Sequence, residues 1–373
     1  MRAAFSPEEE RFRQEVVEFL APWRDLDGFF AQGRRWERVR RLFRALGERG
    51  WLSLGWPAGA GGPERSITRE YILWDEAALA RAARNPLASG IVAKTIARHG
   101  DDEQKRRWLP PIGRGELHFS LGYSEPEAGS DLAGLRCRAE RRGDHYRVEG
   151  QKCWQSYAQD MDYLWLLCRT GTQESRGRGL SLLIVDLRAP GVAVGALPTL
   201  DGDRLSEIHL DGVEVPVCQR IGPEDGAWSL VSEALADERH IQFPPKRVRR
   251  DFEETRDWLG ARGLLRDAAL RRRLAELAAQ VLEVEMHALR VLDAMRRGRS
   301  GAVEAAASKV FQTEVAQAIA RLALEFGGAA ALADDARPGT LWRQSLWETI
   351  GGGTSEIMRG VVARQALGLG ART

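Results

Sequence analysis

Several features that identify common protein classes are absent or scarce in this chain of 373 residues. The formal net charge is only +2, from 55 basic and 53 acidic residues, so no field of one sign indicates a nucleic-acid partner. Lysine is scarce among the basic residues, which are mostly arginine; it occurs at Lys94, Lys105, Lys152, Lys246 and Lys309. We interpret this bias as genome composition, with anion binding as the alternative.

Signals for disulfides, metals, export and membranes are also missing. The four cysteines, Cys137, Cys153, Cys168 and Cys218, form no CxxC pair and have no histidine cluster near them. This pattern predicts reduced, mostly buried thiols and no metal site. The first ten residues turn acidic without an apolar stretch, and no run of about 18 apolar residues occurs. We therefore expect a cytoplasmic protein without a membrane span.

The common nucleotide-binding fingerprints are absent as well. No GxGxxG sequence follows a predicted strand and opens a helix. Gly351-Gly352-Gly353-Thr354 imitates a phosphate loop but lacks the lysine that such a loop requires. The chain therefore carries no Rossmann fingerprint, and we do not expect a P-loop.

The hydrophobic pattern changes twice along the chain. From Ser6 to about Gly115 it is helical, with Ser6 as N-cap and Pro7 at the first helical position. Further helices are predicted at Trp36–Arg49, Ser66–Ala83 and Asp102–Leu109. Between about Glu116 and Pro223 the pattern predicts short strands, at Tyr146–Val148, Leu164–Cys168, Leu182–Val185 and Ile208–Leu210. This middle segment is typical of a compact β-barrel or sandwich.

Turn and helix signals refine this outline. Arg142–His145 and Asp211-Gly212 both favour hairpins. From Trp228 onward helices return, with long ones predicted at Arg271–Met295 and Ala302–Glu325. Pro244-Pro245 is expected to break the first C-terminal helix, which begins near Trp228, early, and Arg247–Arg250 is interpreted as a solvated helix face.

Three short segments carry residues suited to a binding site. The first runs from Leu121 to Asp131 and contains Tyr-Ser-Glu-Pro-Glu-Ala-Gly-Ser-Asp; the second is Gly150-Gln-Lys-Cys-Trp-Gln-Ser156. The third, Ile350–Arg359, contains Gly-Thr-Ser-Glu-Ile-Met-Arg. Each alone is compatible with a structural turn. Together, in this order and spacing, they resemble the signatures of the acyl-CoA dehydrogenase family over nearly the whole chain.

The resemblance implies a mainly α fold with a central β domain. Its parts are an N-terminal helical domain (1–116), a middle β-barrel (117–226) and a C-terminal four-helix bundle (227–373), with FAD between barrel and bundle. By position in the signatures, the cofactor-binding residues are Tyr123, Ser124, Trp154, Ser156, Thr354 and Glu356. Ser130, Arg239 and Gly352 match positions near the substrate. Trp154 and Ser156 would supply the apolar flank and the aimed donor that an isoalloxazine requires.

The resemblance also indicates where the catalytic base lies. Many members of the family place a glutamate just before the Gly-Thr of the third signature, but here Gly352 has no side chain to accept a proton. Isovaleryl and long-chain members carry the glutamate on the opposing helix, immediately before an arginine. Glu238-Arg239 matches that pattern, at what we expect to be the start of a helix. Glu238 is therefore the predicted base, and a surface Glu-Arg pair is the alternative interpretation.

Two departures from the family pattern bear on partners. The Arg and Phe-Gly expected after the first C-terminal helix are replaced by Ala261–Asp267, and the expected glutamine is absent before Gly327-Gly328. In the family both would contact FAD across a subunit interface, so their loss weakens the case for one complete flavin site in every subunit. The resemblance implies a homo- or hetero-oligomer (dimer or tetramer), and shortened members of this sort include the partners of heteromeric dehydrogenases that act on steroid side chains.

The predicted function is dehydrogenation of an acyl-CoA or acyl carrier protein thioester, with an electron-transfer flavoprotein as redox partner. A flavin-dependent oxidase or monooxygenase, and a degenerate subunit that completes a partner's site, remain alternatives.

Overall fold

The computed structural model describes residues 4–26, 35–202, 204–333 and 336–370. The chain divides into two compact units that interleave along the sequence. We call Met1–Arg24, Ile67–Ala82 and Arg239–Thr373 the helical unit, and Asp25–Ser66 and Ala83–Glu238 the mixed unit. The predicted N-terminal helices are thus shared between the units, and the three predicted domain boundaries stay a prediction.

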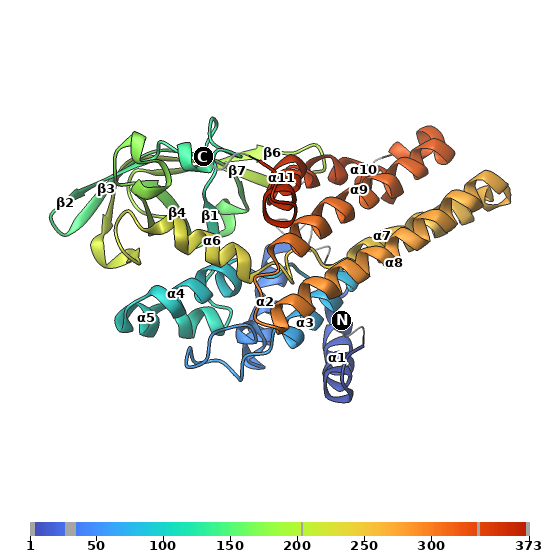
Figure 1. Ribbon diagram of the computed structural model, residues 1–373, viewed down its shortest axis with the longest axis horizontal. Helices are drawn as coiled ribbons and strands as arrows, with labels where there is room; N and C mark the ends of the chain where they lie inside the picture. Colours follow the sequence, from blue (N-terminus) through green and yellow to red (C-terminus); the bar gives the residue numbers. More distant parts are fainter. Residues whose placement is uncertain (1–3, 27–34, 203, 334–335, 371–373) are drawn as a thin grey trace. The chain divides into compact units, whose positions relative to one another are not determined.

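The helical unit contains α1 (Pro7–Leu20), α3 (Ile67–Leu79), α7 (Pro245–Ala261), α8 (Ala268–Arg296), α9 (Ala302–Gly327), α10 (Arg337–Glu348) and α11 (Ser355–Ala366). Figure 1 shows the two longest, α8 and α9, lying side by side. Their apolar residues recur every three or four positions and form one core with α7, which includes Phe252, Leu274 and Ile319. The long predicted helices are confirmed.

The start of α1 shows why a sequence signal predicted it correctly. The Ser6 hydroxyl accepts a hydrogen bond from the Glu9 backbone N–H, and the Glu9 carboxylate accepts one from the Ser6 N–H. This reciprocal capping box satisfies two of the backbone donors left free at a helix start. Pro7 occupies the first turn as expected.

The mixed unit combines a sheet with short helices. Its helices are α2 (Trp36–Glu48), α4 (Ala93–His99), α5 (Asp102–Gly113) and α6 (Ala227–Asp237), with a π-helical turn at Ala88–Val92. Its strands are β1 (Phe119–Gly122), β2 (Arg138–Arg142), β3 (His145–Ser156), β4 (Tyr163–Arg169), β5 (Leu180–Asp186), β6 (Val192–Pro198), β7 (Arg204–Pro216) and β8 (Arg220–Ile221). They form one sheet of order β6-β7-β3-β2-β4-β5-β8, and β1 pairs in parallel with β4.

Strand β4 lies at the centre of this unit, and its sequence explains its position. Trp165 and Leu167 enter a core shared with the helices, whereas Leu164 and Leu166 enter a second core shared with β3 and β7. Because side chains alternate across a strand, a continuous apolar run can serve two cores. The middle strands predicted from the sequence are confirmed, and the fold is mainly helical with a central sheet.

The two hairpin predictions have different outcomes. Gly143, with a φ of +65°, lies in the two-residue turn between β2 and β3, so the first hairpin is confirmed. The second is wrong, because Asp211 and Gly212 lie inside β7. Gly212 has a φ of +63° next to a register shift between β3 and β7. It produces a bulge rather than a turn.

Predictions around the start of the C-terminal segment also need correction. Helix α6 ends at Asp237, before the two prolines, so they do not break it. Instead, Pro244 is the N-cap of α7 and Pro245 its first residue, a position where a missing backbone N–H costs nothing. Glu238 consequently follows the end of a helix, not the start of one.

The arginines of α7 are not a solvated face. Arg247 and Arg250 are buried, with the Arg247 guanidinium paired with Glu348 and the Arg250 guanidinium 2.8 Å from the Asp251 carboxylate. Buried charges persist when they are paired in this way. The sequence indicated a helix here but not which cations find a partner inside the bundle.

One segment, Ala302–Leu332, which contains α9, is long and apolar enough to cross a membrane by length and composition alone. The same helix packs against α7, α8, α10 and α11 within the helical unit. A core helix of a bundle needs this composition, so the apolar sequence of α9 is explained by packing.

Candidate functional site

The first signature forms a tight loop directly after β1. The Glu125 carboxylate accepts hydrogen bonds from the backbone N–H groups of Arg136 (2.7 Å) and Cys137 (2.8 Å). Glu125 also pairs with Ala128 through two backbone hydrogen bonds. These contacts fix the loop from inside, while Ser130 at its far end is exposed.

The second signature lies on β3, where the ladder with β7 is interrupted. Cys153 pairs with Glu207 and Gln155 with Ser206, so Trp154 is the extra residue of a β-bulge. Its φ is +70°, in the left-handed region that a bulky residue rarely adopts. The bulge turns the indole outward, where 60% of the residue is exposed. An exposed tryptophan on a strained backbone indicates a contact surface for a ligand.

A buried lysine joins the first two signatures. The Lys152 ammonium donates to the Tyr123 carbonyl (3.0 Å) and lies 2.8 Å from the Glu125 carboxylate. The Cys153 N–H donates to the Ser124 carbonyl at 3.0 Å. Ser124 is therefore placed beside the bulge that carries Trp154. The Ser120 hydroxyl donates to the Ser156 carbonyl at 3.0 Å, which attaches the end of β3 to β1.

Buried polar atoms lie next to this group. Burial raises the pKa of the Tyr123 hydroxyl well above its usual range, and the Glu238 carboxylate adds to the shift. The Tyr123 hydroxyl, the Trp165 indole N–H and the Gln155 amide oxygen are all buried. The Tyr123 hydroxyl and the Trp165 indole N–H interact with each other, whereas the Gln155 amide oxygen has no hydrogen-bond partner among the described residues. Such an orphaned acceptor is expected where a ligand completes the structure.

Glu238 is seated in the same unit. The residue is buried, 7% exposed, and its Oε1 accepts a hydrogen bond of 2.9 Å from the Asn85 amide. The same oxygen lies against Gly90 in the π-helical turn, so closely that a β-carbon there would be 1.6 Å away. The carboxylate thus faces into the unit rather than outward, as a base shielded from water requires.

The third signature belongs to the helical unit. Gly352 and Gly353 have φ values of +69° and +95°, which only glycine adopts at little cost. A β-carbon on Gly352 would lie 3.1 Å from the Gln242 amide nitrogen and 3.3 Å from the Phe243 ring. The backbone at this position is therefore unsuited to a glutamate.

The turn leads directly into α11. Thr354 is the N-cap, and its hydroxyl accepts from the Ile357 N–H at 3.2 Å. Glu356 is exposed in the first turn, where its own backbone N–H and the Thr354 hydroxyl lower the pKa of its carboxyl. A helix N-terminus with a capped first turn favours acceptor groups and anions.

A second buried lysine holds this turn. The Lys309 ammonium, from the middle of α9, donates to the Gly353 carbonyl. Burial lowers the pKa of Lys309 to about 8, although the carboxylates of Glu348 and Glu356 oppose the shift. Lys309 also lies 5.9 Å from the centroid of the Phe243 ring.

Arg239 and His240 follow Glu238 and belong to the helical unit. Arg239 is half-buried, and burial lowers the pKa of its guanidinium. His240 is buried with its Nε2 2.8 Å from the Glu70 carboxylate. In the shortened segment, Arg262 stacks on Trp258 with 3.8 Å between the guanidinium carbon and the ring centroid.

Sequence reasoning missed the residues that support these loops. Glu125 and Lys152 lie inside the signatures, yet their buried ion pair was not predicted, and neither were the roles of Asn85, Gly90 and Lys309. One signal was present: lysine is rare in the chain, yet Lys94, Lys152 and Lys309 are among its most buried side chains. In an arginine-rich chain, a buried lysine indicates a position that fits a compact ammonium on a linear stem but not a planar guanidinium.

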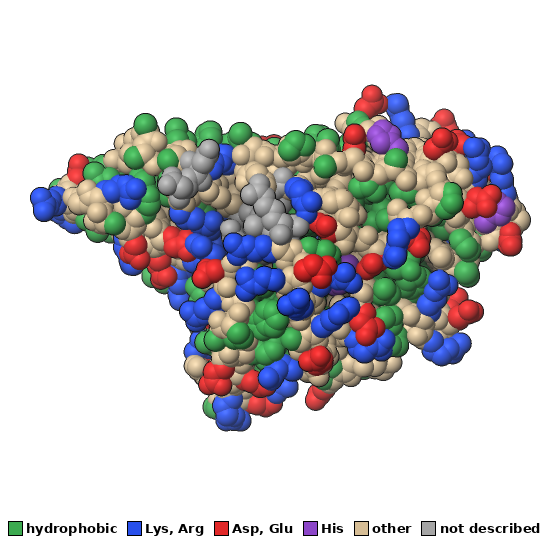
Figure 2. Space-filling view, turned by 180° about the vertical axis from the view of Figure 1, so that it is seen from behind, with side chains coloured by type: hydrophobic (Ala, Val, Ile, Leu, Met, Phe, Trp, Pro, Cys, Tyr) green, Lys and Arg blue, Asp and Glu red, His purple; other side chains and the backbone are tan. Residues whose placement is uncertain are grey.

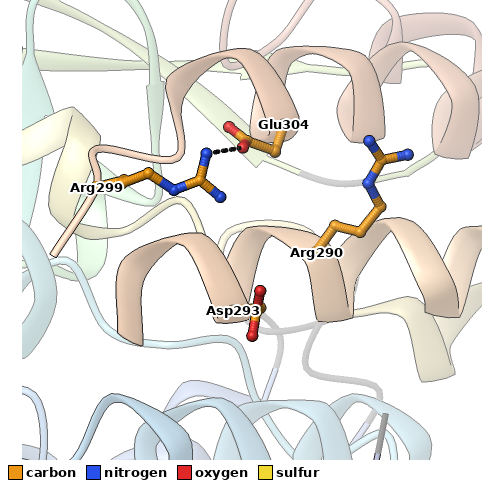
Figure 3. A pocket seen from close by; sticks show the side chains of 4 residues that line it. All are labelled: Arg290, Asp293, Arg299 and Glu304. Carbon is orange, nitrogen blue, oxygen red and sulfur yellow. Dashed lines mark ion pairs between the residues drawn. The ribbon is translucent and has the colours of Figure 1, made fainter. Parts of the chain in front are cut away.

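A surface hollow of about 430 Å³ lies at the turn between α8 and α9 and contains none of the predicted site residues. It is lined by Arg290, Asp293, Arg299 and Glu304, and Figure 3 shows the ion pair between Arg299 and Glu304, whose nitrogen and oxygen are 3.1 Å apart. Asp293 pairs with Arg297 nearby. Basic and acidic side chains are likewise interspersed over the face in Figure 2. The hollow therefore offers little net charge to an anionic thioester.

The mixed unit fits one face of a flavin. An isoalloxazine needs a flat apolar surface and a few polar groups at its edge. Trp154 supplies the surface, the hydroxyls of Ser124 and Ser156 are half-buried beside it, and Gln155 has an orphaned amide oxygen. In the helical unit, the N-terminus of α11 adds Thr354 and Glu356. Each unit thus has groups of the type that the cofactor requires.

Family models match all three parts of the chain: the acyl-CoA dehydrogenase N-terminal domain at residues 6–116, the middle domain at 120–213 and the C-terminal domain at 226–367. Acyl-CoA dehydrogenase FadE26 of Mycobacterium tuberculosis is 36% identical, covering 99% of each chain.

Two solved structures are similar over the full length. A chain of the Tcur3481-Tcur3483 steroid ACAD has a TM-score of 0.90 and 31% identity, covering 99% of this chain and 100% of that one. A chain of the ChsE4-ChsE5 complex from Mycobacterium tuberculosis has a TM-score of 0.88 and 36% identity, covering both chains completely. The chain therefore belongs to the acyl-CoA dehydrogenase family, and it is an FAD-dependent oxidoreductase that acts on the CH–CH bond of an acyl thioester.

Proposed function

We propose that this chain binds FAD through the three signature segments and oxidises a bulky acyl thioester with Glu238 as the catalytic base. Tyr123, Ser124, Trp154 and Ser156 would hold the cofactor from the mixed unit, and Thr354 and Glu356 from the helical unit. Ser130, Arg239 and Gly352 would contact the substrate. When bound, FAD accepts the hydrogen that leaves the β-carbon as hydride.

One contrast carries the proposal. Glu238 is buried with its carboxylate seated by Asn85, whereas Gly352 has a left-handed backbone crowded by Gln242 and Phe243. A base must be shielded, oriented and able to accept a proton, and Glu238 meets these needs. It would take the proton from the α-carbon, while the β-hydrogen leaves and the carbon–carbon double bond forms.

The turn that contains Gly352 and Gly353 would donate a hydrogen bond to the thioester carbonyl. A glycine at 352 keeps its backbone N–H, and its positive φ lets a carbonyl oxygen approach the backbone closely. Negative charge develops on that oxygen as the α-proton leaves, so a fixed N–H donor stabilises the transition state. Arg239, partly desolvated, would add positive charge near the substrate.

A ring-containing substrate and a hetero-oligomer are supported by two findings. A similar solved structure is named a steroid ACAD, and the other is a complex of two different chains. On α8, Leu282 and Met286 are exposed one turn apart, at 58% and 41%. Adjacent apolar side chains on a helix are typical of a partner-binding face. A second acyl-CoA dehydrogenase-like chain would cover this face.

The base assignment is tested by Glu238→Gln. Anaerobic bleaching of the flavin by a thioester should slow at least 100-fold, since general bases contribute about 10²–10⁴-fold, while flavin content is unchanged. Glu233→Gln, an exposed glutamate of α6 next to His99, is the matched control and should bleach normally. A Glu238→Gln protein that bleaches at the wild-type rate contradicts the assignment.

Substrate and partners are tested by screening. The chain, purified alone and with a co-expressed homologous chain, is mixed with linear, branched and steroid thioesters of CoA and of acyl carrier protein. We expect the fastest bleaching with a steroid-type CoA thioester, followed by slow reoxidation in air and fast reoxidation by an electron-transfer flavoprotein. Rapid turnover with oxygen would favour an oxidase. A colourless chain that turns yellow only with its partner would identify a subunit that completes the partner's site.

A further inference from the structure

Two residues of one short segment of the mixed unit, Asn85 and Gly90, lie against the Glu238 carboxylate and form what we call its seat. We propose that Asn85 and Gly90 position this carboxylate: Asn85 orients one oxygen with its amide, and Gly90 leaves the space that the oxygen fills. This inference rests on the proposed role of Glu238 as base, and it assigns positioning roles to two residues that the signatures do not contain.

Gly90 is required by space rather than by backbone conformation. A β-carbon there would lie 1.6 Å from Glu238 Oε1, 2.8 Å from Glu238 Cδ and 2.6 Å from the Asn85 amide nitrogen. These separations are far below van der Waals contact. An alanine would therefore displace both partners of the Asn85–Glu238 hydrogen bond, and because the obstructing atoms are ends of side chains, the backbone need not move.

The π-helical turn places Gly90 where this clearance is needed. The Val92 N–H donates to the Leu87 carbonyl at 3.1 Å, a hydrogen bond five residues back. Such wide turns are uncommon and occur often at functional sites. The Trp56 indole N–H donates to the Ser89 carbonyl at 2.8 Å, which fixes the turn against the core. The seat is thus part of a rigid, buried segment.

The orientation of Asn85 follows from its second contact. The amide nitrogen faces the Glu238 carboxylate, and the amide oxygen faces the Ser89 hydroxyl, which lies 3.3 Å from both Asn85 Oδ1 and the Pro86 carbonyl oxygen. A neutral donor to a carboxylate favours its charged form. In this proposal Asn85 therefore orients the Glu238 carboxylate and contributes to the pH range in which it accepts a proton.

Other ionisable groups of the mixed unit also bear on this carboxylate. The Tyr123 hydroxyl interacts with it electrostatically. Asp237, the preceding residue, forms an ion pair with Arg98 of α4. Variants at Asn85 leave these groups in place, so a change in pH profile would report the lost amide.

The first test uses Gly90→Ala in the flavin-loaded full chain. Flavin reduction by a thioester should fall about 100-fold, the cost expected when a catalytic group is misplaced by about 1 Å. Flavin content and thermal melting should stay close to wild type. Gly113→Ala is the control, because its β-carbon would meet the Trp56 ring at an ordinary 3.4 Å, and it should reduce flavin normally.

The second test remains valid even if the alanine variant fails to fold. Asn85→Leu, of similar size, removes the donor, and the apparent pKa of the acidic limb of flavin reduction should rise by about one unit. Asn85→Asp places a negative charge beside the carboxylate, so the apparent pKa of the acidic limb should rise further, and activity should recover at high pH. If Asn85 had a purely structural role, these variants would lower the rate of flavin reduction without changing the apparent pKa of the acidic limb.

The inference and the proposed function fail in different ways. If Glu238→Gln is inactive while Gly90→Ala and both Asn85 variants show wild-type rates and pH profiles, the seat plays no part and only this inference is overturned. If Glu238→Gln itself reduces flavin normally, the proposed base is wrong, and the seat has no catalytic role.

Discussion

Two buried lysines support the predicted cofactor loops, one in each unit, and they differ in how their charge is compensated. Lys152 lies against the carboxylate of Glu125, itself bonded by two backbone N–H groups. Lys309 donates to a neutral carbonyl, and burial lowers its pKa to about 8. The loop of the mixed unit is therefore held by a full ion pair, and the turn of the helical unit by a single titratable donor.

The largest expected effect comes from breaking the compensated pair. Glu125→Gln keeps the shape of the side chain but leaves the Lys152 ammonium buried without its counter-ion. We expect a loss of about 3–5 kcal/mol in the free energy of unfolding, measured by urea denaturation.

A control exists in the same loop. Asp131 pairs with Arg176 on the surface, with side chains 64% and 56% exposed. Asp131→Asn should cost no more than about 1 kcal/mol. Equal costs for the two variants would mean that the buried pair contributes no more than a solvated one.

The next prediction concerns the turn of the helical unit. Gly352→Glu introduces a side chain at a φ of +69°, where the β-carbon is crowded by Gln242 and Phe243. We expect a destabilisation of about 1–3 kcal/mol. In a Glu238→Gln background this variant should not restore flavin reduction. Recovery to within tenfold of wild type would show that the turn can accommodate the base after all.

Lys309→Met sharpens the comparison further. In a trans peptide the Gly353 carbonyl and the Thr354 N–H point in opposite directions. Without the Lys309 ammonium the carbonyl loses its donor, so the orientation of this peptide, and with it the start of α11, should be less well fixed. We expect about tenfold weaker flavin binding, measured by titration of the apoprotein. Stability at pH 7 should change by less than about 1 kcal/mol, since the lost hydrogen bond is offset by removal of a buried charge. Arg321→Met, an exposed cation on the same helix, should change neither quantity.

The last prediction is a pH dependence of stability that Lys309 should produce. The pKa of Lys309 is lowered to about 8 in the folded state from an ordinary value near 10.5. Between these values the unfolded chain binds more protons, so the Lys309 contribution to stability rises with pH across about 8 to 10.5. The difference between wild type and Lys309→Met should show this slope in urea denaturation. A flat difference across that range would contradict the lowered pKa.

Much of the fold was predictable from the sequence because local signals and packing agree. The capping residues at Ser6 and Glu9, the two long amphipathic helices and the apolar run of β4 each specify one structure. The Asp211-Gly212 signal failed because a left-handed glycine serves a bulge as well as a hairpin. Arg247 is buried against Glu348, and Arg250 against Asp251 and the Ala78 carbonyl, and periodicity does not reveal such pairing.

The candidate site was only partly predictable. The signatures located Trp154, Ser124 and the glycine turn, and the missing glutamate at position 352 directed attention to Glu238. The seat of Glu238 was not predictable, because Asn85 and Gly90 lie about 150 residues away in the sequence, and Gly90 belongs to a π-helical turn that has no sequence pattern.

The central claim is that Glu238 removes the α-proton, and proton exchange measures this step alone. A thioester that lacks a β-hydrogen cannot be dehydrogenated, but its α-proton can still exchange with deuterium oxide, followed by NMR. The flavin-loaded wild-type chain should catalyse this exchange, and Glu238→Gln should slow it at least 100-fold with flavin still bound. Exchange at the wild-type rate in the variant would contradict the assignment.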